Sequence, residues 1–524
     1  MNLWRDIPFV LNLFLGVLVV FPLRVSGSQI PIVNGILGGV HPRPLGIPVP
    51  GTLRYVQNSG FCETTRGVFQ ASGYADLSST ESMWFWFFAA RQNADKAPLV
   101  IWLNGGPGSS SMLGLFQENG PCKISLDSTT VVLNPYSWNN VANMLYIDQP
   151  ITVGFSHGTN TATGAKEAAQ LVWQMLQIFL ADPAFSHLQH NEFGIWTESY
   201  GGHYGPAFAA FFLSQNAAIK KKKIEGIHIN LKTLGIGNGL TDPLIQYPGY
   251  LTYATSNPYN IETATSTQIS TANTLFDEVN GCMAQIQACY KTENQATCSE
   301  AQNFCNTYMS DLYSGLNGRL NPYDIRTLYE SQFQFPPPID NFLKQPDLMT
   351  KIGAESMFTS LSTTVNQAFM MSGDWMLNNA PDLESVILDS SQVRVLIYDG
   401  DADFILNYVG VEAMVSNLKT KYTSKYNKLK WSDFVVSGVK AGQFKQLGTF
   451  GYLRVYGAGH QVPAYGWQDL PPGEAALQFF TYIINGNKLS RGFSLAPNTP
   501  MVTWAVIMLM GFALSMVVGL DVGF

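Results

Sequence analysis

A serine in the middle of this chain stands where a strand-like run meets a glycine-rich turn. The segment reads Trp196-Thr197-Glu198-Ser199-Tyr200-Gly201-Gly202, an apolar run leads into it, and a helical stretch over 204–213 follows it. A sharp turn between a strand and a helix exposes a serine hydroxyl, as nucleophilic catalysis requires. The G-x-S-x-G pattern is half kept, because Thr197 replaces the first glycine. Ser199 is therefore a candidate nucleophile, and a serine that caps a helix is the structural alternative.

A nucleophilic serine needs a histidine that can take its proton, and the chain has seven histidines. His460 lies in Gly457-Ala458-Gly459-His460-Gln461-Val462-Pro463, where a predicted strand ends in a glycine loop. His203 lies about one helical turn past Ser199 and would point along the helix. Hydrolases with a strand–serine–helix turn have their serine, acid and histidine in that order along the chain. This order favours His460.

The acid of such a site holds the imidazole in one tautomer and stabilises its charged form. Three aspartates in Tyr398-Asp399-Gly400-Asp401-Ala402-Asp403 follow a predicted strand over 393–398 and precede His460. Asp399 directly after the strand is typical of a structural residue, and Asp401 of a turn. We favour Asp403, but the spacing by itself does not separate it from Asp401.

A glycine loop follows another predicted strand and could stabilise a developing negative charge. It reads Leu103-Asn104-Gly105-Gly106-Pro107-Gly108. An oxyanion hole needs two preorganised N–H donors, and the loss of one typically lowers the rate by about 10²–10³. We assign these donors to Gly106 and Tyr200. A phosphate-binding loop is excluded, because no Gly-Lys-Ser/Thr follows.

Two glutamates adjoin these elements. Glu198 precedes the candidate nucleophile, and Glu118 follows the glycine loop. A carboxylate beside a developing oxyanion is tolerated if it is protonated or paired, and two carboxyls that share a proton have one strongly raised pKa. A protonated carboxyl and the Asn104 amide can both donate hydrogen bonds to a substrate carboxylate. The pattern predicts a site that recognises a free C-terminus at acidic pH; two ordinary surface glutamates are the alternative.

These residues must be positioned by a sheet, because apolar runs alternate with helical patterns along the chain. The predicted strands are 82–89, 99–103, 144–147, 193–196, 233–236 and 393–398, and the spacing over 165–180 predicts a helix. This alternation indicates the α/β class, with a mostly parallel sheet covered by helices on both faces.

The middle of the chain has a different character. Strand signals disappear over 242–373, where four of the six cysteines cluster. We expect a largely helical, disulfide-stapled insertion between core halves at 51–241 and 374–490, lying over the strand ends where α/β sheets place their sites. A separately folded second domain is the alternative.

Apolar segments stand at both ends of the chain. Residues 1–27 have the order of a signal peptide, with a proline-rich leader over 28–50 behind it. Within the final segment, 491–524, residues 501–520 are uncharged and could just span a bilayer. After a polar spacer they resemble a signal for a glycolipid (GPI) anchor, with 485–487 or 490–492 as attachment site. A single membrane span is the alternative. We expect entry into the secretory pathway and a location that is extracellular or tethered to the membrane at the cell surface.

Composition narrows the classes of partner. The net charge is −7, 13% of the residues are charged, and the longest basic run is Lys220–Lys223, so nucleic acid is not an expected partner. Six cysteines in an exported chain predict three bridges, for which 15 pairings are possible. CxxC pairs are absent, which disfavours zinc. We expect no metal and no cofactor.

Four segments, in this order, are similar to the signature motifs of serine carboxypeptidases, especially of secreted fungal members. They are Trp102-Leu103-Asn104-Gly105-Gly106-Pro107-Gly108-Ser109-Ser110, Glu198-Ser199-Tyr200-Gly201-Gly202, Gly400-Asp401-Ala402-Asp403 and Gly459-His460-Gln461-Val462-Pro463. The resemblance spans about residues 50–490. It implies an α/β-hydrolase fold and an enzyme that releases one C-terminal amino acid at a time from peptides and proteins, through an acyl-enzyme.

The resemblance also implies roles for individual residues. The implied triad is Ser199, Asp403 and His460, so Asp403 is selected over Asp401. Gly106 and Tyr200 match the oxyanion donors, and the implied carboxylate-binding set is Asn104, Glu118 and Glu198. Trp375 resembles an aromatic wall of the side-chain pocket. The nested bridges Cys282–Cys305 and Cys289–Cys298 are implied too, which leaves Cys62–Cys122.

Two other functions remain open. An acyltransferase on the same scaffold would pass the acyl group to an alcohol instead of water. A non-catalytic binding module is disfavoured, because no member of the triad is missing.

Overall fold

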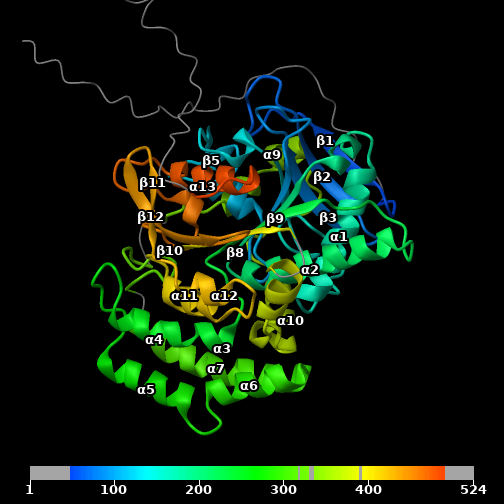
Figure 1. Ribbon diagram of the computed structural model, residues 1–524. Helices are drawn as coiled ribbons and strands as arrows, with labels where there is room; N and C mark the ends of the chain where they lie inside the picture. Colours follow the sequence, from blue (N-terminus) through cyan, green and yellow to red (C-terminus); the bar gives the residue numbers. More distant parts are fainter. Residues whose placement is uncertain (1–47, 317–318, 330–334, 389–391, 490–524) are drawn as a thin grey trace, which may run out of the picture.

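The computed structural model describes residues 48–316, 319–329, 335–388 and 392–489 (Figure 1). Within these residues an eleven-stranded sheet has the order β1-β2-β3-β7-β4-β8-β9-β10-β13-β12-β11. Its strands are β1 (Leu53–Gln57), β2 (Gln70–Asp76), β3 (Ser82–Phe88), β4 (Leu99–Leu103), β7 (Asn143–Ile147), β8 (Phe193–Glu198), β9 (Leu231–Gly237), β10 (Arg394–Gly400), β11 (Ser432–Val436), β12 (Val439–Leu447) and β13 (Phe450–Val455). A separate hairpin pairs β5 (Cys122–Ile124) with β6 (Val131–Leu133).

The centre of the sheet is parallel and its flanks are antiparallel. Strands β7, β4, β8, β9, β10 and β13 pair in parallel. Strands β1 to β3 on one side, and β12 and β11 on the other, add antiparallel pairs. The predicted α/β fold is confirmed. The predicted strands lie in the centre and in β3, because strands covered on both faces have continuous apolar runs.

Helices cover both faces of the sheet (Figure 1). Alternate side chains of a strand point to opposite faces. Phe85 and Phe87 of β3 therefore join an apolar core with residues of α1 (Ala165–Ala181), α2 (Gly201–Lys220) and α11 (Tyr408–Asn417). Trp84 and Trp86 join a second core with residues of α13 (Glu474–Ile484). The short helix α12 (Thr423–Tyr426) follows α11. Two continuous cores fix the sheet on which the candidate site residues stand.

The described residues between β9 and β10 form helices and loops without a sheet strand. The helices are α3 (Pro243–Gln246), α4 (Pro248–Thr255), α5 (Ser266–Asp277), α6 (Cys282–Thr292), α7 (Gln295–Leu316), α8 (Asp340–Leu343), α9 (Pro346–Ile352) and α10 (Thr363–Ser372). Figure 1 shows α4 to α7 as a layer beyond α11 and α12. This layer has its own apolar core. In contrast, Phe342, Leu343 and Ile352 of α8 and α9 belong to the sheet's second core.

Three disulfides hold the chain together. Cys282–Cys305 and Cys289–Cys298 join α6 to α7, as predicted for the helical insertion. Cys62–Cys122 closes a separation of 60 residues near β5. The predicted signal peptide, the leader up to residue 47 and the C-terminal apolar segment lie outside the described residues. Among the helices that are described, we find none that is long and apolar enough to span a bilayer.

Candidate active site

Ser199 occupies a sharp turn between β8 and α2. Its φ is +66°, in the left-handed region that non-glycine residues rarely adopt. A Cβ at Gly202 would lie 2.4 Å from the Leu240 backbone nitrogen, so the start of α2 packs against the chain after β9. The Thr197 hydroxyl donates to the Gly201 carbonyl over 3.0 Å. Thr197 thus stabilises this turn between β8 and α2, which we call the nucleophile elbow. It does so with a side-chain hydrogen bond, at the position where the G-x-S-x-G pattern has its first glycine.

His460 and Asp403 form a close buried pair. His460 Nδ1 lies 2.7 Å from Asp403 Oδ2. Asp403 also accepts hydrogen bonds from the backbone N–H groups of Ile405 (3.0 Å) and Leu406 (3.3 Å). Burial raises the pKa of Asp403, an effect that the positive charge of His460 opposes. The pair can hold the imidazole in the tautomer whose Nε2 accepts a proton.

Asp401 has a different role from Asp403. Its Oδ1 accepts hydrogen bonds from the Tyr259 hydroxyl and, over 3.0 Å, from the Gly457 backbone N–H. Asp401 therefore anchors the glycine loop that leads to His460 and joins that loop to the insertion. The structure thus brings His460 together with Asp403 and not with Asp401.

Asn238 is a site residue that the sequence reasoning missed. It follows β9 with a φ of +37°, and its Nδ2 donates to Asp403 Oδ2 over 2.9 Å. Its Oδ1 accepts the Gly400 N–H over 3.0 Å. Both ends of the amide are therefore paired, which fixes its orientation and places a donor on the candidate acid. The run Gly237-Asn238-Gly239 after a strand was the available signal.

The two predicted oxyanion donors lie on adjoining segments. Gly106 has a φ of +101°, which favours glycine. A Cβ at Gly105 would lie 2.3 Å from the Tyr200 nitrogen, so the glycine loop touches the elbow backbone directly. Within the described part of the chain, neither the Gly106 nor the Tyr200 N–H donates to a protein acceptor. Both residues line one cavity of about 470 Å³ with Ser199 and His460. Both N–H groups are therefore available to a ligand.

A buried aspartate binds the residues that directly follow the glycine loop. Asp148 Oδ1 accepts hydrogen bonds from the Ser110 hydroxyl (2.6 Å) and the Ser111 N–H (2.9 Å), and Oδ2 accepts from the Phe155 N–H (2.9 Å). Burial raises the pKa of Asp148 to about 7. These bonds fix the loop relative to the end of β7.

The predicted carboxylate-binding residues are in contact with one another. Asn104 Nδ2 donates to Glu118 Oε1 and to Glu198 Oε1, each over 3.2 Å. Asn104 Oδ1 accepts from Trp102 Nε1 (2.8 Å) and the Gly114 N–H (2.9 Å), which orients the amide with its donors toward the glutamates. The side chains of Glu118 and Glu198 are buried and lie close together, since each accepts a hydrogen bond from the same Asn104 nitrogen. Two carboxyls that lie this close in a buried site favour a state in which at least one of them is protonated.

The electrostatics support the protonated form. Burial raises the pKa of Glu118, and burial together with the charge of Glu118 raises the pKa of Glu198. Gln461, the residue after His460, also donates to Glu118 Oε1 over 3.2 Å. The sequence reasoning did not assign Gln461 a role. The arrangement offers hydrogen-bond donors beside Ser199 and a proton that is held to higher pH than in an ordinary glutamate.

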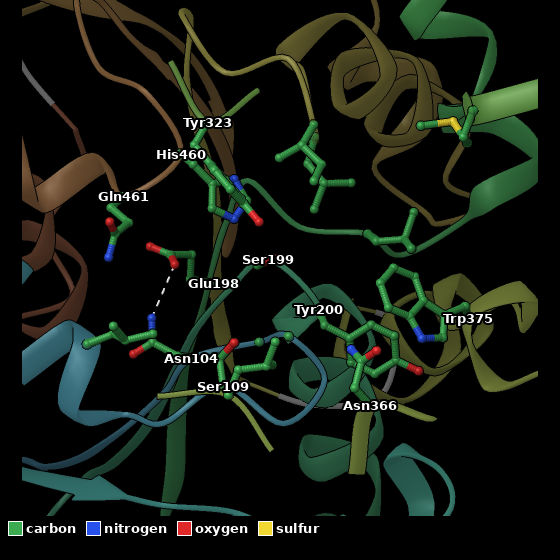
Figure 2. A pocket seen from close by; sticks show the side chains of 18 of the residues that line it. Asn104, Ser109, Glu198, Ser199, Tyr200, Tyr323, Asn366, Trp375, His460 and Gln461 are labelled. Atoms are coloured by element: carbon green, nitrogen blue, oxygen red, sulfur yellow. Dashed lines mark hydrogen bonds between the residues drawn. The ribbon is translucent and has the colours of Figure 1, made fainter. Parts of the chain in front are cut away.

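The cavity has two chemically different sides. Figure 2 shows Asn104, Glu198 and Gln461 on one side of Ser199, and Tyr200 and Trp375 on the other. The side of Trp375 is largely apolar and aromatic, because Trp375 packs in one apolar cluster with the cavity residues Leu240, Tyr247, Tyr250, Met309, Tyr313 and Leu406. Met309 and Tyr313 come from α7, for which the sequence offered no signal. No cluster of three or more metal-ligating side chains occurs among the residues that the structure describes.

Comparisons with known proteins identify the family of this chain. Residues 61–486 match the model of the peptidase S10 family, described as serine carboxypeptidase. Carboxypeptidase S1 of Penicillium janthinellum is 40% identical over 439 residues, which cover 83% of this chain and 100% of that protein. Carboxypeptidase Y homolog A of Trichophyton verrucosum is 36% identical over 434 residues, covering 80% of this chain and 75% of that protein.

A solved structure shares the fold. The prohormone-processing carboxypeptidase Kex1(delta)p of Saccharomyces cerevisiae superposes with a TM-score of 0.62 at 24% identity. The superposition covers 80% of this chain and 91% of that one. At this identity the likeness supports the fold.

Proposed function

This chain belongs to the serine carboxypeptidase family, and from that premise we propose that it hydrolyses the last peptide bond of peptides and proteins with Ser199, Asp403 and His460 as its triad. Serine carboxypeptidase activity follows from the family and from relatives that cover most of the chain. The assignment of roles to residues is our proposal. It is supported by the Asp403–His460 contact and by the cavity that Ser199 shares with His460.

The proposed reaction proceeds through an acyl-enzyme. Ser199 Oγ attacks the last peptide carbonyl while His460 Nε2 takes the serine proton. The carbonyl oxygen gains negative charge and accepts hydrogen bonds from the Gly106 and Tyr200 N–H groups. His460 then gives its proton to the leaving amine, and the C-terminal amino acid departs. Water, deprotonated by His460, attacks the acyl group on Ser199 and releases the shortened peptide.

One observation carries the specificity for chain ends: Asn104 and Glu198 line the cavity beside Ser199, and Asn104 Nδ2 joins Glu198 to the buried Glu118. Donors at this position pair with the terminal carboxylate of a substrate. They thereby place the preceding peptide carbonyl over Ser199. An internal peptide bond has no carboxylate to offer to these donors, so the geometry favours removal of single C-terminal residues.

The test compares an N-blocked dipeptide with the same dipeptide amidated at its C-terminus. We expect release of the last residue from the free acid, and kcat/KM at least about a hundredfold lower for the amide, because hydrogen bonds to a charged group are lost. Chromatography at pH 5 measures the amino acid released from the free acid and the amino-acid amide released from the amidated peptide. Equal rates on the two peptides would contradict carboxylate recognition.

The pH dependence of KM should report the glutamate pair. The pKa of Glu198 is raised by burial and by Glu118, so the shared proton is present below that raised pKa and is lost as the pH rises through it. We therefore expect KM to be constant at low pH and to rise by about tenfold per pH unit above the raised pKa. Glu198→Gln keeps an N–H donor at every pH and should flatten this rise.

The matched control is Glu225→Gln, which changes an exposed glutamate on the loop after α2. This variant should retain the wild-type profile. A rise of KM with pH that is equally steep in Glu198→Gln would show that another group controls substrate binding.

We extend the proposal to the route that the protein takes in the cell. Three disulfides support passage through the secretory pathway, because such bridges persist in oxidising compartments. Tethering by the C-terminal apolar segment rests on the sequence pattern of 501–520.

A further inference from the structure

A buried aspartate outside the proposed triad contacts the residue after the nucleophile. Asp374 follows α10, and its Oδ2 accepts hydrogen bonds from the Tyr200 hydroxyl and, over 3.1 Å, from the Ala165 N–H. Ala165 begins α1, whose N-cap residue Gly164 has no capping side chain. A Cβ at Gly164 would lie 2.4 Å from Asp374 Oδ1, so glycine permits this close approach. One carboxyl thereby joins the start of α1 to the nucleophile elbow.

The ring of Tyr200 is held on its faces as well as at its hydroxyl. It stacks on His203 with centroids 4.6 Å apart and lies 5.2 Å from the Trp375 ring and 5.9 Å from Phe369. Asp374 is the hydrogen-bonding partner that the structure gives to the Tyr200 hydroxyl. The side chain of Tyr200 is therefore anchored at both ends, by its backbone in the elbow and by Asp374 at its tip.

The hydrogen bond from Tyr200 to Asp374 acts on the turn that contains Ser199, whose backbone conformation depends on surrounding contacts. The left-handed φ of Ser199 is a conformation that persists only where surrounding contacts over-determine it. The Tyr200 N–H, which we assign to the oxyanion hole, has no protein acceptor among the described residues that could hold it in place. Its direction therefore depends on the elbow, on α2 and on the tether at the Tyr200 hydroxyl.

We propose that Asp374 is a positioning residue for catalysis, which holds Tyr200 through its hydroxyl so that the Tyr200 N–H stays directed at the developing oxyanion. This inference rests on the proposed function of Ser199 and Tyr200. It adds a residue that lies outside the triad, the oxyanion donors and the carboxylate-binding set. A purely structural role, in which Asp374 only caps α1, is the competing explanation.

Two substitutions separate these explanations. Tyr200→Phe removes the hydroxyl but leaves the ring and the Asp374–Ala165 bond, whereas Asp374→Ala removes both bonds. We expect each to lower kcat about tenfold, less than the 10²–10³ that follows outright loss of an oxyanion donor, and to change KM by less than about twofold. Asp374→Asn can place its amide oxygen where Oδ2 lies, and should stay within about threefold of the wild-type kcat.

A peptide aldehyde gives a readout that helix capping would not change. Ser199 Oγ adds to its carbonyl carbon, the serine proton passes to His460, and the aldehyde oxygen becomes the oxyanion. The inhibition constant should rise in Tyr200→Phe by the factor by which kcat falls. Both substitutions break the same contact, the hydrogen bond between Tyr200 and Asp374. The Tyr200→Phe/Asp374→Ala double variant should therefore be no slower than the slower single variant.

The matched control is Tyr74→Phe in β2, which removes another buried tyrosine hydroxyl; this hydroxyl accepts a hydrogen bond from the Glu355 N–H over 2.8 Å. It should leave kcat and aldehyde affinity unchanged. The inference is wrong if folded Tyr200→Phe retains the wild-type kcat, if only KM changes, or if the two substitutions add. An inactive wild-type enzyme on the N-blocked dipeptide would instead contradict the proposed function itself.

Discussion

Replacement of Ser199 by alanine should lower kcat by about 10⁶-fold, the effect that loss of the nucleophile has in other serine hydrolases. Alanine retains the Cβ of serine and removes only the hydroxyl that attacks the carbonyl. The φ of +66° is equally available to both side chains, so the elbow should keep its conformation. The free energy of unfolding should change by less than about 1 kcal/mol.

The measurement is amino-acid release from an N-blocked dipeptide by Ser199→Ala, together with urea unfolding of both proteins. Ser214→Ala is the matched control, because it removes an exposed hydroxyl from α2 that donates to the Phe211 carbonyl. This control should keep full activity. If folded Ser199→Ala retained more than about a hundredth of the activity, Ser199 would not be the nucleophile.

Alanine in place of Asp403 should lower kcat by about 10⁴-fold, whereas alanine in place of Asp401 should lower it by less than about tenfold. Asp403 pairs with His460 Nδ1 at 2.7 Å, so its loss removes the negative charge that stabilises the imidazolium and the partner that sets the tautomer. Asp401 instead anchors the Tyr259 hydroxyl and the Gly457 N–H.

The same pair of variants should differ in stability as well. Asp401→Ala leaves the buried Gly457 N–H and the hydroxyl of the half-buried Tyr259 without their acceptor, which should lower the free energy of unfolding by about 1–3 kcal/mol. Steady-state kinetics and urea unfolding of the two variants measure both effects. A larger loss of kcat in folded Asp401→Ala than in folded Asp403→Ala would exchange the two assignments.

The local patterns of this sequence were enough to predict the central fold and part of the site. Apolar runs predicted six buried strands, β3, β4, β7, β8, β9 and β10, because a strand covered on both faces needs apolar residues at successive positions. The buried β2 and the half-exposed β1, β11 and β12 lack such runs and were not predicted. Ser199 could be recognised because a strand, a tight turn and a helix meet within a few residues. His460 followed from its glycine loop and from chain order.

The choice of the acid needed contacts between distant segments. Asp401 and Asp403 lie on one short loop, and their spacing left both possible; the family resemblance selected Asp403. In the structure the two carboxyls reach different partners, since Asp403 meets Asn238, 165 positions away, and Asp401 meets Tyr259, 142 positions away. No local pattern encodes such distances.

The sequence by itself determined which residues could act as nucleophile, base and donor, because those roles follow from side-chain chemistry and nearby backbone. Tertiary structure decided which of them meet. It placed Asn104 beside Glu198 across 94 positions, brought Gln461 to Glu118 across 343, and bound Asp374 to Tyr200 across 174. These contacts arise from how the sheet, its helices and the insertion pack together. Ser199 is thus recognisable in sequence as a candidate nucleophile, whereas the partners of the carboxyl groups around it depend on how the chain folds.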